Sequence, residues 1–223
     1  MIEFSNVTKQ YQNHTALSDV SIAVDPGEMV FLTGHSGAGK STVLKLATGI
    51  ETPTNGKIVI NDQEVSRLSK NKISRLRQRI GMIYQNPQLL SNQTVFENVA
   101  LPLVIQGYRQ SEIKRRVHAA LDKVDLLTKA MHFPTALSVG EQQRVGIARA
   151  IINKPEILLA DEPTGNLDPE LSLDILRLFE AFRAVGVTVL IATHDLSLIA
   201  QMPYRMIILH KGVVVKKIKS SRE

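Results

Sequence analysis

The chain has 223 residues, of which 43% are hydrophobic and 22% charged, with a net charge of +6 and no cysteine. This composition is typical of one folded domain, with or without an added lobe, and it excludes disulfide frameworks and thiolate metal sites. The first residues lack the basic-then-apolar pattern of a signal peptide, and no apolar run approaches the roughly 20 residues that span a bilayer. We therefore expect any membrane role to be peripheral.

In chain order, residues 1–30 and 57–66 are typical of short strands around turns such as Asp25-Pro26-Gly27, and we expect them to form an antiparallel sheet. The apolar run at residues 29–33 predicts a buried strand. Residues 40–48 predict a helix that Gly49 ends.

Between this strand and this helix lies a Gly-x-x-x-x-Gly-Lys-Ser motif, the phosphate-binding loop of nucleoside triphosphatases. Glycines let consecutive backbone N–H groups point inward at phosphate oxygens, and the helix that follows adds its positive end. Lys40 is expected to reach the β- and γ-phosphates, and Ser41 to offer its hydroxyl to Mg²⁺. The residues predicted to contact nucleotide here are Gly34, His35, Ser36, Gly37, Ala38, Gly39, Lys40, Ser41 and Thr42.

Positive charges gather in two places, one within residues 67–79 and one at the C-terminus. The members are Arg67, Lys70, Lys72, Arg75, Arg77 and Arg79 in the first, and Lys211, Lys216, Lys217, Lys219 and Arg222 in the second. An anionic membrane surface, nucleic acid and a solvated basic face all fit this pattern. Because aromatic residues make up only 4% of the chain, a nucleic-acid partner is not expected.

Gln85 follows a predicted strand at residues 80–84 and precedes an Asn-Pro loop signal. A glutamine at this hinge can ligate a metal and position water. Residues 86–150 look largely helical, and Ile113, Val117, Leu121 and Val124 share one helix face. Five apolar residues after Gln85 either line a groove for a partner's cytoplasmic helix or form core, and the pattern does not separate the two: Leu89, Leu90, Val95, Phe96 and Val99.

Residues 137–141, Leu-Ser-Val-Gly-Glu, lead into a helix-like run. A serine and a glycine at a helix start can form a second anion site through a hydroxyl, N–H groups and the helix dipole. Two phosphate sites in one chain favour a dimer in which the helix start of one copy covers the nucleotide that the other copy holds.

The remaining candidates follow two apolar runs that predict buried parallel strands. Asp161 and Glu162 end the run at 157–160, where Asp161 is expected to hold Mg²⁺ and Glu162 to polarise the attacking water. His194 follows the run at 187–192 and is expected beside Glu162, within reach of the γ-phosphate. Asp168-Pro169 predicts a helix start, with Gly186 at its end.

Taken together, these motifs resemble the ATP-binding-cassette (ABC) ATPases over essentially the whole length. The resemblance rests on the phosphate loop, Gln85, the signature at 137–141, Asp161-Glu162, the turn at 166–168 and His194. It implies an α/β P-loop NTPase fold with a RecA-like core, an antiparallel β-subdomain and a helical subdomain. It implies one domain, in which residues 1–85 and 151–223 form the nucleotide-binding core and residues 86–150 form the signature lobe.

By the same resemblance, Tyr11 is the aromatic residue that stacks on adenine, and Gln85 senses metal and water. Ser138 and Gly140 contact the γ-phosphate across a dimer, and Asp168 lies in the turn that links the two sites. Glu162 is the catalytic base and His194 the switch histidine, with ATP and Mg²⁺ as ligands. The resemblance thus implies Mg²⁺-dependent ATP hydrolysis that closes and opens two copies.

One position departs from the family pattern, which usually has Ser-Gly-Gly-Gln where this chain has Ser138-Val139-Gly140-Glu141. A β-branched residue disfavours the positive-φ conformations that glycine allows. Either dimer closure is weakened, or the backbone at Val139 is ordinary and the change is tolerated.

Residues 160–168 resemble the branch that contains lipoprotein-release and macrolide-efflux ATPases and a bacterial cell-division ATPase, and the details around His35 and Ala38 favour the last. This implies a separate integral membrane partner, a place at the cytoplasmic face of the inner membrane, and a role in switching cell-wall hydrolysis. The alternative is the ATPase subunit of a lipoprotein-release or small-molecule efflux transporter.

Overall fold

Two β-sheets and a set of helices make up the fold of this computed structural model, which describes residues 1–218. The larger sheet has six strands in the order β10-β9-β3-β8-β7-β6, and the smaller has four in the order β2-β1-β4-β5. The strands are β1 (Ile2–Tyr11), β2 (His14–Val24), β3 (Met29–Thr33), β4 (Asn55–Ile60), β5 (Gln63–Glu64), β6 (Ile80–Tyr84), β7 (Ile157–Asp161), β8 (Thr188–Thr193), β9 (Arg205–His210) and β10 (Val213–Ile218). The helices are α1 (Lys40–Ala47), α2 (Lys70–Gln78), α3 (Val95–Ile105), α4 (Gln110–Asp122), α5 (Val139–Ile151), α6 (Pro169–Ala184) and α7 (Leu196–Ile199), and 3₁₀ turns are η1 (Val65–Arg67), η2 (Leu127–Lys129) and η3 (Pro134–Ala136).

The larger sheet is parallel except at its β10 edge, where β10 pairs antiparallel with β9. Every residue of β3 and of β8 is buried, which explains why these strands are continuous apolar runs rather than alternating ones. Strands alternating with helices around a parallel sheet confirm the predicted α/β class.

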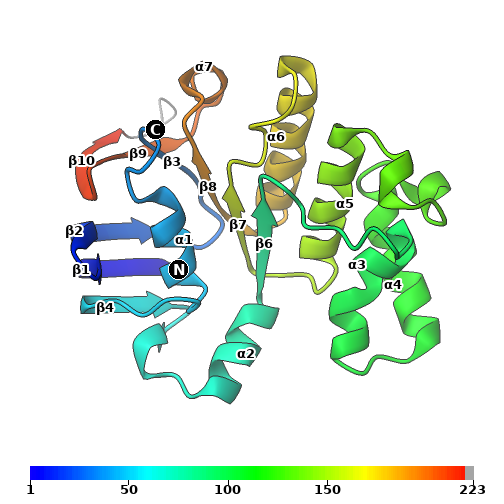
Figure 1. Cartoon of the computed structure of the whole chain (residues 1–223), viewed down its shortest axis with the longest axis horizontal. Helices are drawn as coiled ribbons and strands as arrows, with labels where there is room; N and C mark the ends of the chain where they lie inside the picture. Colours follow the sequence, from blue (N-terminus) through cyan, green and yellow to red (C-terminus); the bar gives the residue numbers. More distant parts are fainter. Residues whose placement is uncertain (219–223) are drawn as a thin grey trace.

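Successive side chains of β3 point to opposite faces of this sheet and enter two separate hydrophobic clusters. Val30 and Leu32 join a cluster that the smaller sheet and α1 complete. Met29 and Phe31 join the other, which α3 to α6 complete. Figure 1 shows the same division, with α1, β1, β2 and β4 on one side of β6 to β8 and α3, α4 and α5 on the other.

The smaller sheet is antiparallel, as expected, but its first two strands are ten and eleven residues long rather than short. Asn6 and Asp19 adopt positive φ of 49° and 52° where the pairing register shifts, and the Asn6 amide donates to Asp19 Oδ1 at 2.8 Å. Such bulges accommodate irregular residues inside a continuous strand.

The segment between β6 and β7 is helical, as predicted. The α4 face made by Ile113, Val117 and Leu121 is buried against α3 and α5. Both α3 and α5 begin with reciprocal capping boxes, formed by Thr94 with Glu97 and by Ser138 with Glu141. These helices share one hydrophobic cluster with β6 to β8, so the packing does not separate a helical lobe from a nucleotide-binding core. The boundaries expected for the lobe, residues 86–150, therefore stay a prediction.

The α6 helix begins as the sequence predicted. The Asp168 carboxylate accepts a hydrogen bond from the Leu171 N–H at 3.0 Å, and Pro169 occupies the first helical position. No helix within residues 1–218 combines the length and apolar character that crossing a bilayer requires.

Candidate active site

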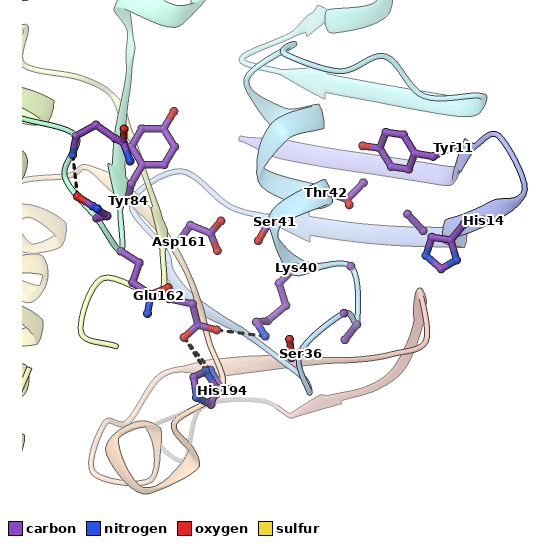
Figure 2. A pocket seen from close by; sticks show the side chains of 17 residues that line it. Tyr11, His14, Ser36, Lys40, Ser41, Thr42, Tyr84, Asp161, Glu162 and His194 are labelled. Atoms are coloured by element: carbon purple, nitrogen blue, oxygen red, sulfur yellow. Dashed lines mark hydrogen bonds and ion pairs between the residues drawn. The ribbon is translucent and has the colours of Figure 1, made fainter. Parts of the chain in front are cut away.

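A pocket of about 790 Å³ lies where parallel strands β3, β6, β7 and β8 end, since neighbouring parallel strands bring their carboxyl ends to one edge. Figure 2 shows its side chains converging from the phosphate loop, from β7 and β8, and from the β1–β2 hairpin. The lining residues are Tyr11, His14, Ala16, Ser36, Gly37, Ala38, Gly39, Lys40, Ser41, Thr42, Tyr84, Gln85, Asn86, Gln88, Asp161, Glu162 and His194.

The predicted phosphate loop joins β3 to α1 and supplies seven lining residues, 36–42. Gly37 and Gly39 have φ of 76° and 106°, and a Cβ added at Gly39 would lie 2.8 Å from the Ala16 carbonyl oxygen, so glycine is required there. Gly34 and His35, also predicted to contact nucleotide, do not line the pocket. Their carbonyl groups lie beneath it and accept from Lys40.

Lys40 is 7% exposed and occupies the floor of the pocket. Its ammonium donates to the Gly34 carbonyl at 2.8 Å and lies 3.2 Å from Glu162 Oε1. A buried ammonium held by carbonyl groups and a carboxylate is stable only because each of its partners compensates for lost water. A phosphate group in the pocket would be a competing acceptor for the same charge.

Glu162 links the loop to β8. Its Oε2 lies 2.9 Å from His194 Nδ1 and accepts from the His194 backbone N–H at 3.3 Å (Figure 2). The Glu162 backbone has a φ of 49°, an uncommon conformation for a non-glycine residue, and its N–H donates to the Ala192 carbonyl at 2.8 Å. The predicted meeting of Glu162 and His194 is therefore confirmed, and it follows from the adjacency of β7 and β8.

Asp161 and Ser41 form the part of the pocket that suits a divalent cation. Asp161 Oδ1 is buried without a hydrogen-bond partner. Burial raises the pKa of the Asp161 carboxyl, while a hydrogen bond from Ser41 acts in the opposite direction. A carboxylate with an unused oxygen beside a serine hydroxyl matches the hard oxygen donors that Mg²⁺ takes. The residues present thus fit the expected cation.

Replacing Asp161 with asparagine is expected to stabilise the nucleotide-free protein at neutral pH by about 1 kcal/mol, because it removes a buried charge whose Oδ1 has no hydrogen-bond partner and whose burial cost outweighs the hydrogen bond from Ser41. The same change is expected to abolish cation-dependent turnover. Urea denaturation of both proteins measures the first effect. Asp174→Asn, which removes a surface carboxylate paired with two arginines, is the control and should not stabilise. A less stable Asp161→Asn protein would contradict the inferred burial cost.

The loop that begins at Gln85 is fastened to α5. The Gln143 side-chain amide, which is buried, donates to the Tyr84 carbonyl at 3.0 Å. Arg149 donates to the Pro87 and Gln88 carbonyl groups, and a Cβ added at Gly146 would lie 2.7 Å from Pro87 Cβ. The loop at Gln85 and the helix that begins at the signature are therefore in direct contact.

The β1–β2 hairpin supplies the opposite wall. Tyr11 lines the pocket as predicted, and Lys9 Nζ lies 4.7 Å from the centre of its ring. The sequence interpretation missed His14, which pairs with Tyr11 across the hairpin, and Tyr84, which precedes Gln85. The signal for His14 was its place at the end of a tight turn after Tyr11, because residues paired across a hairpin lie side by side.

Ser138, Gly140 and Asp168 are not among the pocket's lining residues. Ser138 is the N-cap of α5, where its hydroxyl accepts from the Glu141 N–H at 3.3 Å. Figure 1 shows α5 on the far side of β6 and β7 from α1, which follows the phosphate loop. One copy of the chain therefore does not bring its two predicted anion sites together.

Val139 is the first residue of α5 and is 58% exposed. It is not among the positive-φ residues, so of the two alternatives the ordinary backbone is the one observed. We expect Val139→Gly to change turnover by less than about twofold and to cost up to about 1 kcal/mol of folding free energy, since glycine weakens helices. Steady-state turnover and urea denaturation check this. A large rise in turnover would show that the valine hinders closure.

A second groove of about 580 Å³ lies on α3 and α4, and its lining includes Phe96, Leu101, Val104, Lys114 and Met131. Val104 and Met131 are 53% and 73% exposed, which is high for apolar side chains. The five residues predicted either to line a groove or to form core divide between these outcomes. Val95 and Val99 are fully buried core, Phe96 lines the groove, Leu89 packs partly on the core, and Leu90 is exposed outside the groove.

Comparison with known proteins agrees with this geometry. The ABC transporter family profile matches residues 17–165. The cell division ATP-binding protein FtsE of Escherichia coli K12 is 58% identical over 213 residues, which is 95% of this chain and 96% of that protein.

Two solved structures of the bacterial ABC transporter cassette MJ0796 have the same fold. The dimeric structure has a TM-score of 0.90 at 36% identity and covers 98% of both chains. The dimeric post-hydrolysis state bound to ADP and Pi has a TM-score of 0.89 at 35% identity, again over 98% of both chains. The fold, the pocket and these similarities agree, and the chain belongs to the ABC transporter family of ATP-binding cassette ATPases.

Proposed function

We propose that this chain is the ATP-hydrolysing subunit of a membrane complex that acts in bacterial cell division, where two copies close on two ATP molecules. The observation that carries the proposal is the single pocket that joins Lys40, Glu162 and His194 while leaving Ser138 outside. A cassette built in this way holds the catalytic groups but lacks a cover for the nucleotide. The similarity to FtsE supplies the cellular role.

ATP would lie with its adenine on Tyr11 and its phosphates on the loop at residues 36–42. The glycine turn and the N-terminal end of α1 favour anions, and Lys40 would exchange the Gly34 carbonyl for phosphate oxygens. Ser41, Gln85 and Asp161 would hold Mg²⁺, which when bound offsets the negative charge of the β- and γ-phosphates.

Glu162 would act as the base that takes a proton from the attacking water. The proton would go to Glu162 Oε1, the carboxylate oxygen that becomes free when the Lys40 ammonium turns from it to the phosphates. His194 orients that carboxylate through its Nδ1 contact and lies at the end of β8, where it can face the γ-phosphate. Gln85, exposed on the loop that α5 holds, would report the nucleotide state to the signature helix.

The second copy would complete each site. Ser138 and Gly140 lie at the N-terminus of α5, where the helix dipole has its positive end, so the signature of one copy can cover the γ-phosphate that the other holds. Asp168, which caps α6 just after the turn from Glu162, would link the two sites. The MJ0796 cassette has been solved as a dimer.

The membrane component would be an FtsX-like integral membrane protein. The apolar groove on α3 and α4 offers a docking site for a cytoplasmic helix of that partner, because helix-in-groove recognition buries exposed apolar anchors such as Val104 and Met131. This would place the chain at the cytoplasmic face of the inner membrane, where ATP cycles would switch cell-wall hydrolysis.

A crosslinking experiment tests the dimer. Because the chain has no cysteine, any disulfide in the double variant His35→Cys, Val139→Cys joins introduced residues, and the two single variants control for pairing between like positions. We expect a crosslinked dimer with ATP in the Glu162→Gln background and little without ATP. Equal crosslinking with and without nucleotide, or none, would overturn the closed dimer.

Copurification tests the membrane role. The chain, solubilised from membranes with its partner, is expected to bring down an FtsX-like protein, and Val104→Asp with Met131→Asp is expected to reduce that recovery. Recovery of a lipoprotein-release or small-molecule efflux component instead would favour the alternative ABC system and overturn the cell-division role.

A further inference from the structure

A third groove, of about 680 Å³, lies between α2 and the turn that precedes it, away from the nucleotide pocket. Its lining residues are Gln63, Glu64, Arg67, Leu68, Lys72, Arg75, Leu76 and Arg79. Four of these eight are cations, and Glu64 is the only acid. The groove is thus strongly positive.

The structure separates the cations of residues 67–79 by what they contact. Arg77 donates to the Thr48 and Gly49 carbonyl groups at 3.0 and 2.8 Å and so caps the end of α1. Arg79 binds Glu156 through two hydrogen bonds of 2.7 and 2.6 Å. These two arginines have structural roles.

Arg67 pairs with Glu64 at 2.9 Å but is 82% exposed. Lys72 and Arg75 line the groove and have no side-chain hydrogen bond or ion pair to any residue in 1–218, and the same holds for Lys70 beside it. The positive charges of Lys70, Lys72 and Arg75 are therefore available to a partner, and the exposed Arg67 lies beside them with its charge shared with Glu64.

The arrangement on α2 is electrostatically unfavourable without an anion. Lys72 and Arg75 fall at i and i+3 of α2, so two unpaired like charges share one helix face. Lys70 and Lys72 also occupy the first turn, where the helix has its positive end and acids are preferred, and α2 has no acid there. An anionic partner on this face would offset both repulsions.

The chemistry of the groove favours lipid headgroups over nucleic acid. None of the eight lining residues is aromatic, so bases have no ring to stack on, whereas Leu68 and Leu76 add apolar surface among the cations. Clusters of four or more Lys and Arg are typical of sites that bind anionic lipids.

The position of α2 is compatible with a membrane contact during nucleotide turnover. Because α2 directly precedes β6, it lies at the amino end of that strand, while Tyr84 at the carboxyl end lines the nucleotide pocket. Figure 1 shows α2 projecting beyond both sheets. Contact at α2 thus leaves the pocket free.

We propose that the α2 groove, through Arg67, Lys72 and Arg75, binds the phosphate groups of anionic lipids and so gives the chain a direct contact with the membrane surface. This goes beyond the proposed docking on a membrane protein. It requires no change in the site of hydrolysis.

Vesicle flotation of the whole chain tests this inference. We expect binding to phosphatidylcholine vesicles that contain about one third phosphatidylglycerol, little binding to phosphatidylcholine alone, and weaker binding at high salt. Lys72→Gln with Arg75→Gln is expected to weaken binding at least about tenfold. ATP turnover and recovery of the membrane protein should stay at the parent level, so failure here is distinguishable from failure of the proposed function.

The matched control is Arg115→Gln with Lys123→Gln, which removes the same two charges from exposed positions on and after α4. It should bind vesicles as the parent does. The proposal is overturned if the α2 variant binds as tightly as the parent, if both variants lose binding equally, or if a fluorescent DNA duplex competes for the groove and depends on Lys72 and Arg75 more than vesicles do.

Discussion

Replacing Glu162 with glutamine is expected to reduce ATP turnover by at least about a hundredfold and to trap two copies around bound ATP. Glutamine has nearly the same shape and retains an oxygen for His194, but it does not accept a proton from water. The γ-phosphate that holds the two copies together would then persist. Phosphate release measures the first effect, and size-exclusion chromatography with ATP measures the second.

Glu156→Gln is the matched control, because Glu156 is a half-exposed carboxylate that binds Arg79 outside the pocket. It should keep parental turnover and show no trapped dimer. A Glu162→Gln protein that still turns over within about threefold of the parent would remove Glu162 from the role of base, whatever the dimer does.

Replacing Lys40 with alanine is expected to weaken ATP binding about a hundredfold, because a charged donor to the phosphates is worth a few kcal/mol in a buried site. The change also leaves the Glu162 carboxylate without its ammonium partner at 3.2 Å. Titration of a fluorescent ATP analogue measures the affinity.

Lys45→Ala removes an exposed lysine from the same helix and controls for loss of charge and for helix propensity. It should bind nucleotide as the parent does. Urea denaturation separates a binding defect from unfolding. If folded Lys40→Ala protein bound ATP as tightly as the parent, the phosphate loop would not be the site that grips the nucleotide.

Local chemistry explains what the sequence predicted well. The loop at residues 34–41 needs positive φ at Gly37 and Gly39, and α6 needs a cap at Asp168 followed by Pro169. Each of these features depends on residues within one or two turns of each other, so the pattern of residue types is sufficient. The same logic predicted short strands within residues 1–30 and was wrong about their length, because Asn6 and Asp19 form bulges within β1 and β2 while the sheet supplies the pairing on either side.

Contacts between distant segments were only partly predictable. The meeting of Glu162 with His194 followed from two apolar runs that end in polar residues, because parallel neighbours end at one edge. The attachment of the Gln85 loop by Gln143 and Arg149 had no such signal, since both look like ordinary polar residues of a helix. Gln143 is buried only because α5 packs on β6.

The basic stretch shows the same limit. In the sequence, the cations of residues 67–79 are equivalent, and three uses for them remained open. The structure assigns Arg77 to the end of α1 and Arg79 to Glu156, and leaves Lys72 and Arg75 in a groove. Of the C-terminal cluster, Lys219 and Arg222 lie outside the described residues.

By itself, the order of residues determined the phosphate loop, the strand and helix that flank it, and the capped start of the signature helix, because backbone conformation and hydrogen bonds over a few residues specify these features. Only the tertiary structure decided that Lys40 faces Glu162, that Tyr11 and His14 wall the same pocket, and that Ser138 stands apart from it. Those outcomes depend on strand order and on the packing of helices against the sheet. Such packing is set by the burial of many side chains together rather than by any short motif.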